Sequence, residues 1–77
     1  MEKTLDQFKE NETGIVKKIL VQGRIRQRLF DMGVTPKTVI TFKKASPLGD
    51  PIEVLVRGYS LTLRKDEALN ILMEVTE

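Results

Sequence analysis

The sequence predicts a mainly β domain, a small β-barrel of about five short strands with one inserted α-helix and short helical turns. Four stretches alternate apolar and polar residues with a period of two, as strands with one buried face do, and a fifth is apolar and β-branched apart from two lysines. Only one stretch, at about residues 22–32, has the spacing of an amphipathic helix. Short strands joined by tight turns in a chain of 77 residues are typical of a barrel, whose closure removes free sheet edges.

The first part of the chain predicts a helical turn, a loop and a strand. Leu5 and Phe8 are three residues apart, which places them on one face of a single helical turn. The polar residues and glycine at 10–14 are typical of a turn between elements. Residues 15–21 are apolar and β-branched apart from two lysines, and this composition predicts the first strand.

The predicted helix has a well-defined end. Its apolar stripe, at positions i, i+4 and i+7, consists of Ile25, Leu29 and Met32. Gly33 follows at the C′ position, where the positive φ of a Schellman ending suits glycine. Val34 is then placed to contact Leu29, and Pro36 blocks any continuation of the helix.

The second half of the chain predicts four more strands and one helical turn. The strands are residues 38–44, 51–57, 60–64 and 71–76. Gly58 and Tyr59 are predicted to form a two-residue hairpin turn with glycine first. Residues 65–69 are polar and favour a single helical turn. We assign structural roles to Leu29, Met32, Gly33, Pro36, Gly58 and Ala68.

The composition excludes several functions. The chain has no cysteine and no histidine, and no glycine-rich phosphate loop, so we predict no catalytic residues, no enzyme activity and no cofactor. A net charge of +2 is too small to favour nucleic acid as a partner. The polar first residues do not resemble a signal peptide, and no apolar run is long enough to span a membrane. We therefore expect a single cytoplasmic domain, residues 1–77.

Four short motifs follow one another along the chain. They are Arg-Leu-Phe-Asp-Met-Gly-Val-Thr-Pro at 28–36, Ala-Ser-Pro-Leu-Gly-Asp-Pro at 45–51, Val-Arg-Gly-Tyr at 56–59 and Leu-Arg-Lys-Asp-Glu-Ala at 63–68. With these motifs the chain from Thr4 to Val75 resembles the ferrous iron transport protein A family, FeoA. The resemblance implies an SH3-like β-barrel with an inserted helix. It also implies a role in iron homeostasis as a small bacterial, cytoplasmic accessory of FeoB, the ferrous iron permease with a GTP-binding domain, through which the chain is peripheral to the membrane.

The resemblance leaves one turn and one alternative function open. Family members usually carry Pro-Gly after the helix, whereas here Pro36 is followed by Lys37, so a Cβ stands where glycine is common. The same small barrel forms the C-terminal domain of metal-dependent repressors. A free-standing relative of that domain, acting in metal-responsive regulation, is therefore the alternative to a FeoB accessory.

A stiff loop between two predicted strands is the first candidate binding surface. Its residues are Pro47, Leu48, Gly49, Asp50 and Pro51. Two prolines and a glycine fix the loop, so little conformational entropy is lost when it binds a partner. A leucine at its tip offers apolar area that a plain turn does not need. The other interpretation is a simple connector, with Leu48 folded back onto the core.

Basic residues on and before the helix are the second candidate. They are Lys17, Lys18, Arg24, Arg26 and Arg28. We predict that Arg24 and Arg26 contribute to the partner surface, facing an acidic partner or anionic lipid headgroups, while a solvated charged face is the alternative. Arg28 is expected to pair with Asp31, three residues further on.

Metal binding is not predicted. Without histidine or cysteine, only carboxylates, carbonyls and methionine sulfur remain as ligands, and protein Fe(II) sites usually include imidazole. Asp50 and Glu53 are close in sequence, but two carboxylates that flank a turn are most often solvated. We expect no metal ligands and no tight iron site in this chain.

Overall fold

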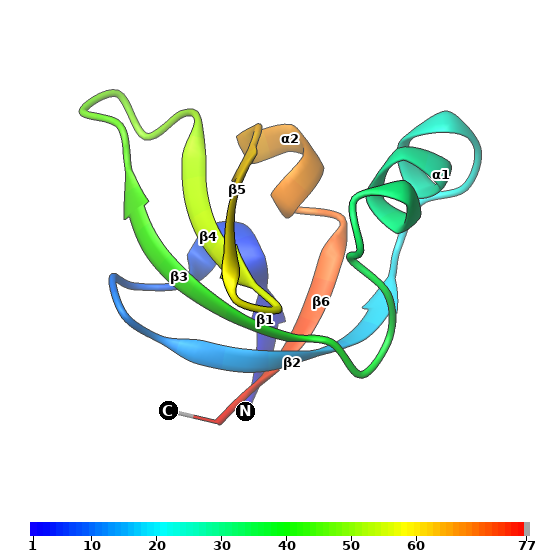
Figure 1. The fold of residues 1–77 in the computed structure, drawn as a ribbon, viewed down its shortest axis with the longest axis horizontal. Helices are drawn as coiled ribbons and strands as arrows, with labels where there is room; N and C mark the ends of the chain where they lie inside the picture. The colour runs from blue at the N-terminus through cyan, green and yellow to red at the C-terminus, as the bar shows by residue number, and fades with distance from the viewer. Residues whose placement is uncertain (77) are drawn as a thin grey trace.

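The computed structural model describes residues 1–76, and its centre is one six-stranded antiparallel sheet with the order β1-β6-β2-β3-β4-β5 (Figure 1). The strands are β1 (Glu2–Thr4), β2 (Thr13–Ile19), β3 (Val39–Ala45), β4 (Ile52–Val56), β5 (Tyr59–Leu63) and β6 (Ile71–Val75). The helical elements are the 3-10 turn η1 (Leu5–Gln7) and the helices α1 (Arg24–Asp31) and α2 (Lys65–Ala68). The mainly β class with one inserted helix is confirmed. The strands number six rather than about five, because the three residues of β1 are too few to show an alternating pattern.

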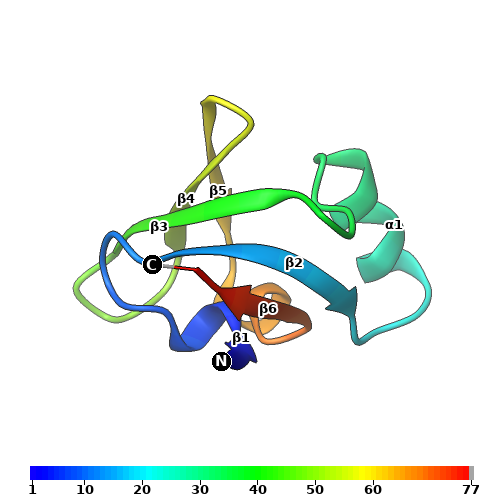
Figure 2. The same cartoon turned by 90° about the horizontal axis from the view of Figure 1, so that it is seen from below.

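The sheet curls around its core, as Figures 1 and 2 show. Part of this curvature comes from a register shift in β2 and another in β3, because a bulge bends a strand and increases its twist. A bulge also turns two consecutive side chains outward. This explains the lysine pairs that interrupt both strands: Lys17 and Lys18 in β2, and Lys43 and Lys44 in β3, are all exposed.

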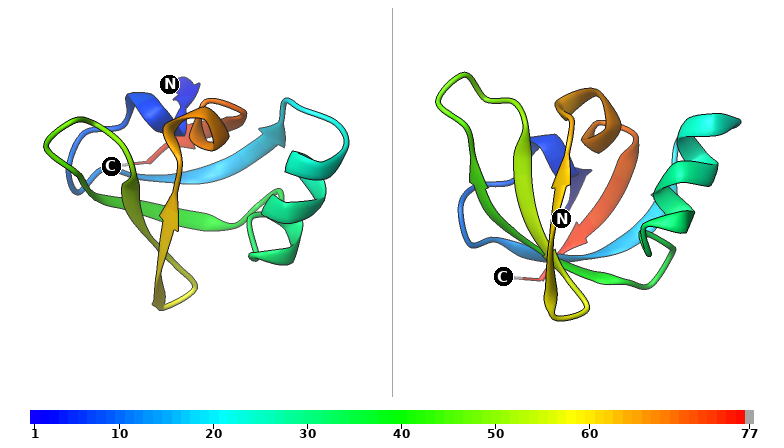
Figure 3. Two further views of the ribbon diagram at one scale, coloured as in Figure 1. Left: turned by 90° about the horizontal axis from the view of Figure 1, so that it is seen from above. Right: turned by 45° about the horizontal axis from the view of Figure 1, so that its top comes forward.

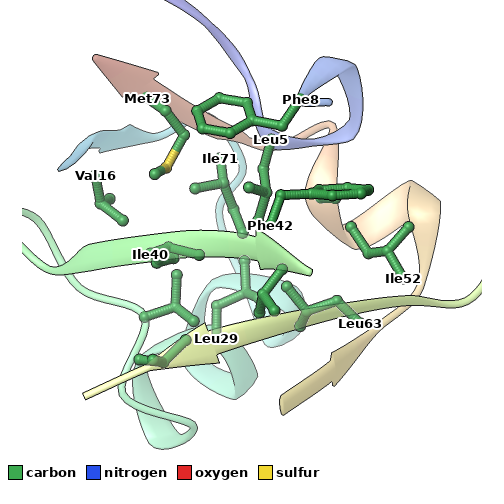
Figure 4. Close-up of a cluster of buried hydrophobic side chains, with 14 of the residues drawn as sticks. Leu5, Phe8, Val16, Leu29, Ile40, Phe42, Ile52, Leu63, Ile71 and Met73 are labelled. Carbon is green, nitrogen blue, oxygen red and sulfur yellow. The ribbon is translucent and has the colours of Figure 1, made fainter. Parts of the chain in front are cut away.

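The core fills the inside of the curled sheet (Figure 4). Its buried side chains are Leu5, Phe8, Val16, Ile19, Leu29, Val34, Ile40, Phe42, Ile52, Val54, Val56, Leu63, Ala68, Ile71 and Met73. The alternation read from the sequence correctly placed the inward residues of β3, β4 and β6. The predicted pair is also buried, with Leu5 in η1 and Phe8 directly after it. Ala68, which we assigned a structural role, is fully buried in α2.

Helix α1 ends as the sequence predicts. Gly33 has φ +91°. The Val34 N–H donates to the Leu29 carbonyl at 2.9 Å, and the Gly33 N–H donates to the Phe30 carbonyl at 3.0 Å, which together form a Schellman motif. Leu29 and Val34 are both fully buried. The predicted apolar stripe is only partly correct, because Ile25 at its start is 39% exposed.

The turn after α1 resolves the question raised by Lys37. The Thr38 N–H donates to the Thr35 carbonyl at 3.1 Å, so residues 35–38 form a β-turn with Pro36 at its second position. Lys37, at the third position, has φ +76°, which is the type II geometry that favours glycine. Its N–H donates to the Val16 carbonyl at 2.7 Å, so pairing with β2 holds the lysine in this conformation.

The β4–β5 hairpin differs from the prediction by one residue. Val56 pairs with Tyr59, so the two loop residues are Arg57 and Gly58 rather than Gly58 and Tyr59. Both have positive φ, +51° and +87°, as a type I′ turn requires, and glycine is therefore second. Tyr59 belongs to β5, and its hydroxyl donates to the Met32 carbonyl at 2.9 Å, which joins the hairpin to the end of α1.

The start of β2 contains a close backbone approach at a residue that the sequence assigned to a turn. Gly14 lies within β2, and a Cβ at this position would lie 2.7 Å from the Glu74 carbonyl oxygen and 2.9 Å from the Phe8 ring. Glycine is therefore needed for β2 to pack against β6 and the Phe8 ring. Nearby, the hydrogen bond from Lys3 to Glu12, 2.8 Å long, and a second from the Lys9 N–H lower the pKa of Glu12.

Among the described residues, no helix has the length and apolar character needed to cross a membrane.

Candidate partner-binding surface

The loop between β3 and β4 projects from the sheet and is closed by its own backbone. The Gly49 N–H donates to the Ser46 carbonyl at 2.7 Å, and the Ser46 N–H donates to the Pro51 carbonyl at 3.0 Å. Gly49 has φ +85°, which a residue with a Cβ rarely adopts. Leu48 at the tip is 95% exposed, so it does not fold back onto the core. The loop thus presents an apolar side chain on a closed, hydrogen-bonded frame.

Asp50 joins this loop to α2. Its carboxylate Oδ1 accepts the Lys65 N–H, the first of α2, at 3.1 Å. The N–H groups of a first helical turn have no partner within the helix, so this contact satisfies one of them. Asp50 is therefore a structural anchor at the base of the loop as well as a candidate contact residue. Sequence reasoning missed this role, because the two residues are 15 positions apart.

Glu67 joins α2 to α1. It is 6% exposed, and its Oε2 lies 3.1 Å from Arg28 Nε, while its Oε1 accepts the Arg64 N–H at 2.9 Å. The expected pairing of Arg28 with Asp31 was wrong, since Asp31 instead accepts a hydrogen bond from Gln27 at 2.9 Å. The only sequence signal for Glu67 was its place three residues after Arg64, where a glutamate reaches back to the start of a helix.

These contacts bring the loop, α1 and the β5–α2 connection around one hollow. The hollow has a volume of about 450 Å³ and is lined by Arg28, Asp50, Pro51, Thr62, Leu63, Arg64 and Glu67. A second hollow of about 330 Å³ lies on the other side of the loop, beside Pro47 and Lys44. The loop therefore stands between two concave surfaces.

The two predicted arginines are separated by the structure. Arg24 is exposed and lines a further hollow together with Ile25, Arg28 and Arg64. Arg26 is half-buried, and its guanidinium lies 4.8 Å from the centre of the Phe30 ring, a cation–π contact. Arg24 thus lies beside the same hollow as Arg28 and Arg64, which Asp66 and Glu67 also line, whereas Arg26 is held by Phe30.

The carboxylates near the loop do not converge. Asp50 is directed to α2, and Glu53 lies 4.0 Å from the Lys44 ammonium. Within residues 1–76, no three carboxylates gather in a geometry that suits a metal ion. The loop face combines the exposed Leu48 with basic and acidic side chains.

Comparison with known proteins gives consistent results. A family model described as FeoA domain matches residues 3–75. The structure of a FeoA-like protein from Clostridium acetobutylicum has a TM-score of 0.92 and 37% identity, over 99% of this chain and 88% of that one. The solution structure of iron(II) transport protein A from Clostridium thermocellum has a TM-score of 0.91 and 33% identity, over 95% of this chain and 45% of that one.

Two other matches are more distant. An Fe(2+) transport protein A/Fe(2+) transporter FeoB fusion protein from Porphyromonas gingivalis is 25% identical over 71 residues. That match covers 92% of this chain but 8% of the fusion protein. The crystal structure of T. acidophilum IdeR has a TM-score of 0.88 at 22% identity, over 97% of this chain and 34% of that one, which shows a shared fold alone.

Proposed function

This chain belongs to the FeoA domain family, and from that premise we propose that it is a small, non-catalytic accessory protein of ferrous iron transport. The family model spans nearly the whole chain, and solved structures named for iron(II) transport protein A share its fold. Because the FeoA domain is a non-catalytic module, its contribution to transport would be made through contacts. We place it on the cytoplasmic side, held near the membrane by its partner.

The partner that we propose is a FeoB-like permease with a GTP-binding domain. The support is the Porphyromonas gingivalis relative, in which a transport protein A segment is joined to a FeoB transporter in one chain. Fusion keeps two interacting modules at a high effective concentration, and it is useful only if their geometry allows contact. In the present protein the same association would form between separate chains.

The observation that carries the docking proposal is the exposed tip of the 46–51 loop. A leucine that is 95% exposed on a loop closed by two backbone hydrogen bonds can enter a partner pocket with little loss of conformational entropy. Arg24 and Arg64 lie around the adjacent hollows and would meet acidic groups of the partner, while Arg28 pairs with Glu67 within the chain. Apolar anchors of this kind dominate binding energy, while rim charges mainly affect association rate.

The regulatory alternative gains no comparable support. The likeness to IdeR and to manganese-dependent repressors lies at 12% to 22% identity and concerns the fold alone.

The test compares two Leu→Ala variants against the detergent-solubilised permease by pull-down and calorimetry. Leu48→Ala should weaken binding by more than about 1 kcal/mol, because it truncates the anchor. Leu20→Ala is the matched control: Leu20 is 48% exposed, lies after β2 and does not line the hollows beside the loop, so this variant should bind as the wild type does. Equal binding by all three proteins would reject Leu48 as the anchor.

A further inference from the structure

The two edges of the sheet are built differently. β1 has only three residues and carries Glu2 and Lys3, and short length and charge are two ways in which proteins block pairing at a free edge. β5 has five residues, Tyr59 to Leu63, with no charged residue, no proline and no register shift against β4. β5 therefore lacks three of the usual protections against pairing with another strand, namely charge, proline and a bulge.

The register of the hairpin shows which backbone groups of β5 are free. A two-residue loop makes Val56 and Tyr59 a hydrogen-bonded pair, and hydrogen-bonded pairs alternate along an antiparallel ladder. The N–H and C=O of Leu61 therefore face β4, whereas those of Ser60 and Thr62 face away from it. Within residues 1–76, no other backbone group bonds to those of Ser60 or Thr62, and both residues are exposed.

The free edge of β5 lies on the side of the sheet that faces α1, as both views of Figure 3 show. The hollow of about 450 Å³ lies at the end of this edge, lined by Thr62, Leu63 and Arg64 from β5 and its connection and by Arg28 from α1. An added strand would thus lie along the β5 backbone on the side where α1 lies, with Arg28 at one end and the Tyr59–Met32 hydrogen bond at the other.

The charges at the two ends of β5 are positive. Arg57 precedes the strand and donates to Thr38 Oγ1 at 3.3 Å, and Arg64 and Lys65 follow it. Asp66 comes next, while the carboxylates of Asp50 and Glu67 at this end already accept the Lys65 and Arg64 backbone N–H groups. If a second copy paired its β5 antiparallel to this one, Arg57 of each copy would approach Arg64 and Lys65 of the other, and like charges placed opposite each other destabilise a sheet. The charge distribution instead favours a strand with carboxylates near its ends.

We propose that β5 accepts an extended peptide segment as an additional strand, and that this segment carries acidic residues near its ends. Main-chain hydrogen bonds to Ser60 and Thr62 would hold it, as in other cases of strand addition to a free edge. Only the identity of the partner that supplies the segment rests on the proposed function. The β5 edge would bind a free peptide of this kind whether or not that partner is correct.

The first experiment measures amide hydrogen exchange by NMR, with and without a synthetic peptide. The probe alternates threonine and valine and has two aspartates at each end, and the control probe has lysines in place of the aspartates. In the free protein, the Ser60 and Thr62 amides should exchange at least 10-fold faster than the Leu61 amide. The aspartate probe should slow exchange at Ser60 and Thr62, and the lysine probe should not. Slow exchange of these two amides in the free protein, or equal effects of the two probes, would overturn the proposal.

The second experiment uses variants of Thr62. Thr62→Pro removes the outward N–H without removing a bond to β4, and Thr62→Val keeps it. Thr62→Pro should lower probe affinity at least 10-fold, and Thr62→Val should change it less than 3-fold. If Thr62→Pro does not fold, Arg64→Gln should still weaken the aspartate probe and leave the lysine probe unchanged. Equal probe affinity for the wild type and a folded Thr62→Pro, or for the wild type and Arg64→Gln, would overturn the proposal.

The same variants separate this inference from the proposed function. If Leu48→Ala weakens permease binding and Thr62→Pro leaves both permease and probe binding unchanged, the accessory role stands and strand addition is wrong. If the aspartate probe protects Ser60 and Thr62 but the permease does not bind the wild type, strand addition stands and the proposed partner is wrong.

Discussion

The end of α1 and the 46–51 loop carry the same sequence signals and have opposite surroundings. Each contains glycine with positive φ and proline, and each belongs to a motif by which the family resemblance was identified. At the end of α1, Leu29 and Val34 are fully buried, and Tyr59 from the neighbouring hairpin bonds to the helix end. In the loop, Leu48 is 95% exposed.

Glycine and proline fix the backbone conformation in both segments, but they do not determine whether the neighbouring apolar side chains are buried or exposed. The helix end is fixed so that two apolar side chains enter the core. The loop is fixed so that one apolar side chain remains outside it. We therefore expect substitutions at the helix end to lower the free energy of unfolding, and substitutions at the loop tip to leave it unchanged.

The largest expected effect is that of Leu29→Ala. Leu29 is fully buried, and truncating such a leucine typically costs about 2–5 kcal/mol in free energy of unfolding. Ile25→Ala on the same helix is the control: Ile25 is 39% exposed, so the loss should be clearly smaller. Urea denaturation followed by circular dichroism measures both. Similar losses for the two variants would mean that α1 does not pack on the core through Leu29.

The next effect is that of Gly33→Val. Any L-residue is strained at φ +91°, and its Cβ would lie 2.9 Å from the Tyr59 hydroxyl oxygen, so we expect a loss of more than about 1 kcal/mol. Combining it with Tyr59→Phe separates strain from contact, because Tyr59→Phe removes the contacted atom. The double variant should lose less free energy of unfolding than the sum of the single variants. A Gly33→Val protein with the wild-type urea midpoint would contradict the assigned helix end.

The third effect concerns the one part of the loop that is joined to the fold. Asp50→Ala removes the acceptor of the Lys65 N–H, and losing such a bond at a helix start typically costs about 1 kcal/mol. Asp50→Asn keeps an oxygen acceptor and should lose less. If Asp50→Ala is measurably destabilised, the loop itself divides into two parts. Asp50 then contributes to the stability of the fold, whereas Leu48 at the tip does not.

The sequence predicted local and periodic features well. The alternating strands, the apolar pair at η1 and the Schellman ending depend on residues within a few positions of one another, so a local pattern carries them. The Arg28–Glu67 pair and the bond from Lys65 to Asp50 join residues far apart in sequence, and nothing local indicates them. The bulges were also missed, because strict alternation cannot place Val16 and Ile19 on the same face of β2.

The candidate surface was predicted only in part. The stiffness of the 46–51 loop follows from its prolines and glycine, but the exposure of Leu48 does not, since an apolar side chain on a loop can equally fold onto a core. The grouping of Arg24 with Arg28 and Arg64, without Arg26, depends on the arrangement of α1 against α2. The hairpin turn was misplaced by one residue because Arg57, unlike glycine, gives no signal of positive φ.

The smallest expected effect is that of Leu48→Ala on stability. Surface substitutions that break no cap, core contact or hydrogen bond usually change the free energy of unfolding by less than about 0.5 kcal/mol. Leu48 is 95% exposed, and the hydrogen bonds that close its loop come from the backbones of Ser46, Gly49 and Pro51, which the change leaves in place. Thermal unfolding should therefore match that of the wild type. A loss of about 2 kcal/mol or more would place Leu48 in the core in solution. The contrast with the helix end would then disappear, and weaker permease binding by this variant would reflect misfolding instead of a lost contact.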